Sequence, residues 1–245
     1  MAIFMMKKII TLLFIFLCVG FVKAQQSAEV TYKVHSIDNP EQYRQMRQQF
    51  GEDSYNRTLK KHQRIYAIAK DLDFVLKFNP NESLYYCDED MPDETINIYY
   101  SIMAKILGSG MSIKYQNRKD SLLMVQGKSP GSNKLYRETS SLYKYKWQIT
   151  NETNTIMGYP VIKAVSKNVE VWFAPDIPVP FGPAGYGGLP GLILKKRFIK
   201  QFPAYELVAT EIHFYKKPIK IKKPEKGVLR TEEEGRTSRI KAMNR

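Results

Sequence analysis

The sequence predicts a mainly β protein with a few helices, an α+β fold in which a long antiparallel meander of strands is covered on one side. Three observations support this prediction. Segments in which apolar and polar residues alternate recur along most of the chain, as expected for half-buried strands. Turn signals such as Asn79-Pro80-Asn81 and Lys167-Asn168 separate these segments. Helical patterns are confined to the first half of the chain, whereas a parallel α/β sheet needs a helix between successive strands.

The strand pattern is clearest at 29–36, where Val30, Tyr32 and Val34 alternate with polar residues. Similar patterns predict further strands at 73–78, 83–87, 112–116, 121–126, 143–149, 156–165, 169–173, 192–198 and 204–214. Helical patterns and start signals predict helices at 40–50, 57–69 and 94–107.

Residues 1–24 have the pattern of a cleaved signal peptide. Two lysines precede an apolar run at 9–21, and residues 22–24 offer a small-residue cleavage site. The run is shorter than the roughly 20 residues that a membrane span needs. Leu17 stands before Cys18, where a lipoprotein signal requires a small residue, so lipidation is not expected. The mature protein is therefore expected to be exported, periplasmic or secreted, and either soluble or peripheral to a membrane.

Residues 25–215 are expected to form a single β-rich domain, followed by a basic, poorly ordered tail at 216–245. The formal net charge is +14, which cleavage of the signal peptide lowers to +11. The tail alone holds eleven Lys or Arg against four Glu. A basic tail could contact nucleic acid through phosphates, but export makes an anionic membrane surface the better expected partner.

Cys87 is the single cysteine that remains after cleavage, so no internal disulfide is expected. A reactive thiol needs a cationic neighbourhood, whereas Asp88, Glu89 and Asp90 follow this one. Cys87 is therefore interpreted as a half-buried strand residue.

The segment 172–194 (WFAPDIPVPFGPAGYGGLPGLIL) contains five Gly and five Pro, and Asp176 is its one carboxylate. A flexible linker would be polar, and a helix or strand would not tolerate so many breakers. The segment is therefore predicted to be a rigid, shaped loop that leads into a buried strand.

The end of this segment, Gly188 to Ile193, spells GLPGLI, and the chain resembles the GLPGLI family of exported Bacteroidetes proteins. The resemblance covers roughly 143–194, with a looser Pro-rich ending at 217–226. An upstream block (Trp147-Gln148-Ile149-Thr150, Ile156, Gly158-Tyr159, Lys163-Ala164) and a central block (Trp172, Ile177-Pro178, Gly182-Pro183, Tyr186) carry it.

The resemblance implies export and a Bacteroidetes host, whereas the activity of the family is unsettled. A similar region looks like the bowl-shaped N-terminal domain of a bacterial peptide-N-glycosidase. The resemblance therefore implies a single curved sheet, half-barrel or bowl-like in shape. Many members carry Cys where this chain has Val161, so a family-wide cysteine chemistry is not expected here.

The motifs that could carry catalysis or bind a metal all have simpler interpretations. In Gly127-Lys128-Ser129-Pro130-Gly131 the proline lacks the N–H that a serine-hydrolase elbow needs for its oxyanion hole. The three histidines lie far apart, and the acidic run 88–94 lacks the glycine of a calcium loop. Asp176 has no sequence neighbour that could serve as its acid–base partner. We therefore expect no catalytic set, no metal site and no cofactor.

Aromatic residues in the strands are the remaining functional signal. They are typical of sheet packing, and they would also suit a concave surface that binds an apolar ligand or a glycan. The leading hypothesis is an exported, non-enzymatic binding or envelope-assembly factor. Its partner would be an amphipathic small molecule, a lipid, a glycan or an outer-membrane protein. The expected ligand-binding residues are Trp147, Tyr159, Trp172, Asp176, Tyr186, Leu189 and Pro190. Alternatives are an envelope hydrolase that uses Asp176, and a structural accessory of a surface receptor.

Overall fold

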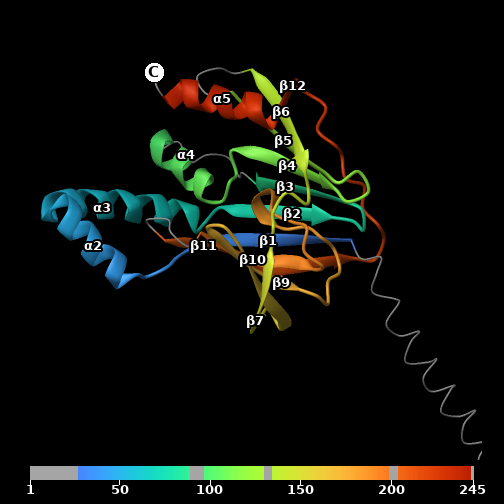
Figure 1. Cartoon of the computed structure of the whole chain (residues 1–245), viewed down its shortest axis with the longest axis horizontal. Helices are drawn as coiled ribbons and strands as arrows, with labels where there is room; N and C mark the ends of the chain where they lie inside the picture. Colours follow the sequence, from blue (N-terminus) through green and yellow to red (C-terminus); the bar gives the residue numbers. More distant parts are fainter. Residues whose placement is uncertain (1–26, 89–96, 130–133, 199–203, 244–245) are drawn as a thin grey trace, which may run out of the picture.

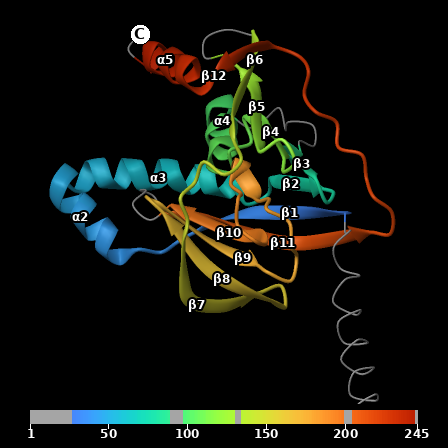
Figure 2. The ribbon, with the colours of Figure 1, turned by 45° about the vertical axis from the view of Figure 1, so that its right-hand side comes forward.

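Twelve strands pair into one open, curved sheet in the computed structural model of the chain (Figures 1 and 2). The structure describes residues 27–88, 97–129, 134–198 and 204–243. The predicted signal peptide and most of the acidic run at 88–94 lie outside these residues. The strands are β1 (Ser27–Ser36), β2 (Asp73–Phe78), β3 (Glu82–Asp88), β4 (Ser112–Asn117), β5 (Leu122–Lys128), β6 (Leu135–Ser141), β7 (Gln148–Ile156), β8 (Tyr159–Ser166), β9 (Val169–Ala174), β10 (Leu192–Phe198), β11 (Tyr205–Tyr215) and β12 (Val228–Thr231). Their order in the sheet is β12-β6-β5-β4-β3-β2-β1-β11-β10-β9-β8-β7.

The centre of the sheet is β1, which pairs antiparallel with β2 and β11. Its residues Val30, Tyr32 and Val34 are buried on one face, as their alternation predicts. The register between β1 and β2 places Phe74 beside Tyr32 and Leu76 beside Val30. These cross-strand neighbours form the middle of the main hydrophobic core. The prediction of a mainly β, α+β fold on an open curved sheet is confirmed.

Three helices follow the first strands: α2 (Pro40–Phe50), α3 (Glu52–Ala69) and α4 (Ile98–Leu107). Helices α3 and α4 pack against the core on one side of the sheet, whereas α2 buries no side chain and packs against α3 (Figure 2). Side-chain caps fix two helix starts: Asn39 Oδ1 accepts from the N–H of Gln42 at 3.1 Å, and Asn97 Oδ1 accepts from the N–H of Tyr99 at 2.9 Å. Within the described residues, none of the helices is long and apolar enough to cross a bilayer.

The C-terminal residues differ from the expectation of a poorly ordered tail at 216–245. Val228–Thr231 forms β12, which pairs in parallel with β6, and α5 (Glu232–Met243) follows it. The sheet is therefore mixed rather than purely antiparallel. Side-chain contacts accompany this pairing: Arg230 Nη2 lies 2.6 Å from Glu138 Oε1 and its guanidinium 3.5 Å from the Tyr136 ring centroid, and Arg137 Nε donates to the carbonyl of Gly227 at 3.2 Å.

Two predicted strands differ from the strands of the structure. The predicted strand at 143–149 is mostly a connection, because β7 begins at Gln148. The predicted strand at 156–165 is broken by a tight turn at Met157-Gly158, where both residues have positive φ. Strand β6 was not predicted, and neither was most of β7. Since β7 is an exposed edge strand of mostly polar residues, it shows no apolar alternation.

The Gly/Pro-rich connection from 175 to 191 is folded against the sheet and largely buried. Its short helix η2 (Pro183–Gly185) lies against β2, β3 and β4, on the core face of the sheet (Figure 2). Gln116 Nε2 donates to the carbonyls of Gly185 and Tyr186 at 3.3 and 3.2 Å. Backbone bonds close the loop on itself, including Gly188 N–H to Pro180 O at 2.9 Å. The loop therefore fills the curve of the sheet, with backbone groups bonded within the loop and to Gln116 of β4.

Candidate functional site

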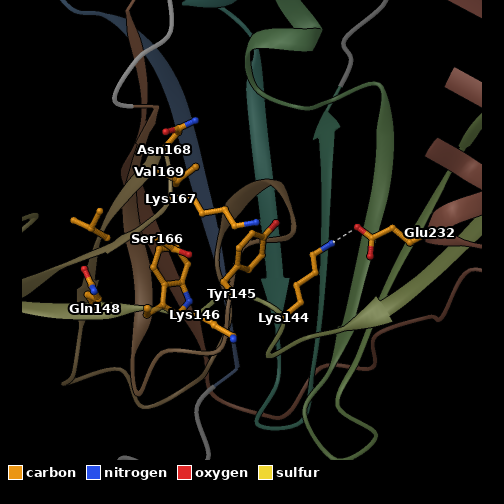
Figure 3. A pocket seen from close by; sticks show the side chains of 11 residues that line it. Lys144, Tyr145, Lys146, Gln148, Ser166, Lys167, Asn168, Val169 and Glu232 are labelled. Carbon is orange, nitrogen blue, oxygen red and sulfur yellow. Dashed lines mark hydrogen bonds and ion pairs between the residues drawn. The ribbon is translucent and has the colours of Figure 1, made fainter. Parts of the chain in front are cut away.

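A hollow of about 840 Å³ opens beside this loop, between three segments that are distant in sequence (Figure 3). One wall is the connection before β7, another is the β8–β9 turn, and the third is the first residue of α5. The lining residues are Lys144, Tyr145, Lys146, Trp147, Gln148, Val165, Ser166, Lys167, Asn168, Val169 and Glu232. Since α5 contributes to the lining, the C-terminal segment is part of the site.

Tyr145 and Trp147 line the hollow and Tyr186 packs against both of them, and the three rings form the aromatic base of the site. The rings of Tyr145 and Tyr186 stack with their centroids 4.7 Å apart, and Trp147 lies 5.5 Å from Tyr145. Trp147 Nε1 donates to the carbonyl of Gly187 at 2.9 Å, which ties the cluster to the buried loop. These contacts hold the aromatic rings in fixed orientations before any ligand arrives.

The two tyrosines remain neutral at physiological pH. Burial raises the pKa of Tyr145 to about 12, and it raises the pKa of Tyr186 further. Their side chains share a hydrogen bond, which raises the pKa of Tyr186 and lowers that of Tyr145. The aromatic base is therefore uncharged, with hydroxyl groups as its polar atoms.

The rim of the hollow is cationic. Lys144 Nζ lies 3.1 Å from Glu232 Oε1, and its ammonium also lies 5.5 Å from the Tyr145 ring centroid. Lys146 and Lys167 add two exposed amines. Lys167 has positive φ in the β8–β9 turn and extends toward Tyr145 (Figure 3). The arrangement offers an aromatic surface with positive charge at its edge.

The structure brings only part of the expected ligand-binding set together. Trp147 lines the hollow and Tyr186 packs behind it, whereas Leu189 and Pro190 line a separate hollow of about 300 Å³ with Arg118 and Tyr143. The other three expected residues lie elsewhere.

Trp172 and Tyr159 pack against the main core, whereas Val171 and Phe173, the neighbours of Trp172 in β9, pack with Trp147 and Tyr186 in a second cluster. The period of two along a strand puts Trp172 and Phe173 on opposite faces, which explains this separation. Asp176 lies on an exposed turn after β9 and lines neither of these hollows.

Two buried lysines were not anticipated from the sequence. Lys196 is 1% exposed, and its Nζ has no hydrogen-bond partner among the described residues. The Nζ lies 3.8 Å from the Phe198 ring centroid and 5.3 Å from that of Tyr186. Burial lowers the pKa of Lys196 to about 7. In Lys195-Lys196-Arg197 the sequence shows three cations, and only the pleat of β10 reveals that the middle one points inward.

Lys114 is the second buried lysine, and its surroundings differ from those of Lys196. Its Nζ donates to the carbonyls of Ser109 and Ser112. Burial lowers its pKa to about 7, with a smaller contribution from the charge of Lys196. Within the described part of the chain, no group of three or more His, Cys, Asp or Glu is placed to hold a metal ion.

Comparison with known proteins gives a short family match and a fold match. A family model described as "Protein of unknown function (Porph_ging)", which is associated with Bacteroidetes, matches residues 165–195. Two crystal forms of PNGF-II are similar in structure, with TM-scores of 0.52 and 0.53 and sequence identities of 18% and 19%. The matches cover 89% of this chain but only 33% and 34% of the PNGF-II chains, so this likeness concerns the fold alone. No curated protein matches.

Proposed function

We propose that the protein is an exported, non-enzymatic binding factor that takes an amphipathic ligand in the hollow beside Tyr145 and Trp147. The observation that carries this proposal is the aromatic base, because its rings are fixed by stacking and by the bond to Gly187. A site that is rigid before binding loses little conformational entropy when the ligand arrives. The hollow also has the size and the aromatic lining that are typical of ligand sites.

The family assignment belongs to the same proposal. The matched stretch 165–195 includes Gly188 to Ile193, the residues that spell GLPGLI, and we infer that the chain is a GLPGLI-type protein. Export would follow from the signal-peptide pattern at 1–24. The placement of Asp176 on an exposed turn supports binding better than hydrolysis, because a general acid of raised pKa needs a shielded site.

The proposal is tested by expressing the protein with its signal peptide and purifying it from the periplasm. Native mass spectrometry and extraction with organic solvent then identify retained molecules. Trp147→Ala should reduce retention, and Trp172→Ala is the matched control because Trp172 packs on the opposite face. Circular dichroism confirms that both variants are folded. Wild-type protein that retains nothing, or equal retention by the two variants, would contradict the proposal.

A further inference from the structure

We propose that the ligand of this hollow is an acidic saccharide, whose negative group is held by the lysines at the rim while a sugar ring stacks on the aromatic base. This inference rests on the proposed binding function and narrows its ligand class. The charge balance of the lining is its first support. Three lysines line the hollow together with a single carboxylate, that of Glu232.

The available positive charge comes from Lys146 and Lys167. Glu232 neutralises Lys144 through their 3.1 Å contact. Neither Lys146 nor Lys167 has an ion-pair partner among the residues that the structure describes, and both are exposed. Two uncompensated ammonium groups at the edge of one hollow attract an anion and offer it charge-assisted hydrogen bonds.

The neutral lining favours a saccharide over an acyl chain. Gln148, Ser166 and Asn168 contribute amide and hydroxyl groups, which can pair with sugar hydroxyls. Only Val165 and Val169 are aliphatic, so a lipid tail would find little apolar surface apart from the rings. Aromatic rings with polar neighbours suit the apolar face and hydroxyl edge of a pyranose, because each ring is flat and one side of the sugar carries C–H groups.

In the Lys144–Glu232 pair, the carboxylate of Glu232 competes with an anionic ligand for the ammonium group of Lys144. Glu232 is the first residue of α5, and its side chain is 56% exposed, so it can be replaced without disturbing the core. Removal of its charge would free Lys144 as a third cation beside Tyr145. The structure therefore predicts a variant that binds an acidic ligand more tightly, an outcome that general damage to the protein would not produce.

The probe is a hexamer of galacturonic acid, compared with its methyl ester, which has the same backbone without the charge. Isothermal titration should show binding of the acid that weakens as salt is raised. Lys146→Gln and Lys167→Gln should each weaken binding of the acid about tenfold, the worth of one charge-assisted hydrogen bond, and should change binding of the ester little.

Glu232→Gln should tighten binding of the acid about threefold, a modest gain because the freed amine is partly solvent-exposed. Glu233→Gln is the matched control, since Glu233 pairs with Arg236 within α5 and does not line the hollow. Equal binding of acid and ester would overturn the charge inference and leave the proposed function intact. Binding of neither saccharide would overturn the acidic-saccharide inference, whereas the molecules retained by the purified protein decide the proposed function separately.

Discussion

The buried loop at 175–191 and the open hollow beside it meet at the same aromatic cluster. They differ in how many of their polar groups already have a hydrogen-bond partner within the protein. In the loop, backbone groups bond to one another and to Gln116 and Trp147. In the hollow, Lys146 and Lys167 remain exposed at the rim. The difference teaches that the Gly/Pro-rich segment, the most distinctive part of the sequence, has a structural role, while the proposed binding chemistry lies in its polar neighbours.

The largest expected loss of stability comes from Gly187→Ala, a substitution in the loop. A Cβ at this position would lie 2.5 Å from the carbonyl oxygen of Pro180 and 2.9 Å from Gln116 Nε2, so backbone would have to move. We expect a loss of about 3 kcal/mol or more in the free energy of unfolding, measured in urea.

Gly158→Ala is the control for this change. Gly158 has φ of +80° in an open turn, and an added Cβ would meet nothing within 4 Å. Its cost should be about 1 kcal/mol, from backbone strain alone. Equal losses in the two variants would break the contrast between a filled loop and an open surface.

The second effect concerns the buried amine of Lys196. Its pKa is about 7 in the folded protein and near 10.5 in the unfolded chain, so between these values the unfolded state binds more protons. Stability should therefore rise from pH 7 to pH 10, and Lys114 contributes with the same sign. Lys196→Met should stabilise the protein at pH 7 by on the order of 2 kcal/mol, with a smaller gain at pH 9.5.

The neighbouring residue provides the comparison for Lys196. Lys195 lies on the opposite face of β10, 2.6 Å from Glu206, and Lys195→Met should lower stability by about 0.5 kcal/mol. Urea unfolding of both variants at pH 7 and 9.5 measures the difference. A Lys196→Met variant that is less stable than wild type at pH 7 would show that the amine is held by favourable contacts instead.

Arg230→Gln tests the C-terminal wall of the hollow. The substitution removes the ion pair to Glu138 and the contact with Tyr136, and it leaves a buried carboxylate. We expect a local loss of about 1.5 kcal/mol, seen as faster proteolysis after residue 216 with little change in the unfolding of the rest. Arg236→Gln, which breaks an exposed pair within α5, should leave the proteolysis rate unchanged. Equal protection in both variants would mean that the contacts of Arg230 with Glu138 and Tyr136 do not hold β12 in place.

Much of the fold could be predicted from strands that have one buried face and one more exposed face. The alternation of Val30, Tyr32 and Val34 identified β1, because one face of that strand is buried and the other is not. The same reasoning failed for β7, which is exposed on both faces, and for β12, in which only Arg230 is partly buried. A local pattern of alternating residues reports the burial of one face, and it gives no signal where both faces of a strand are exposed.

The candidate site was less accessible from the sequence, for a geometric reason. Trp147 and Tyr186 were among the expected residues and lie together, but Trp172 faces the other way because it alternates with Phe173. The lysines of the rim come from a connection and a turn that meet only through the pairing of β7, β8 and β9. No spacing along the chain encodes that meeting, so the cationic rim could not be predicted.

Apart from the control variants, Trp147→Phe has the smallest expected effect on stability. It tests both regions at once, because this side chain lines the hollow and donates to Gly187 O. Phenylalanine keeps an aromatic face and removes the donor, so stability should fall by about 1 kcal/mol. If the loop only fixes the ring, binding of the galacturonate hexamer should weaken less than twofold, as measured by titration. A tenfold loss would mean that the position of the loop itself shapes the hollow, and the division between structural loop and binding surface would then have to be abandoned.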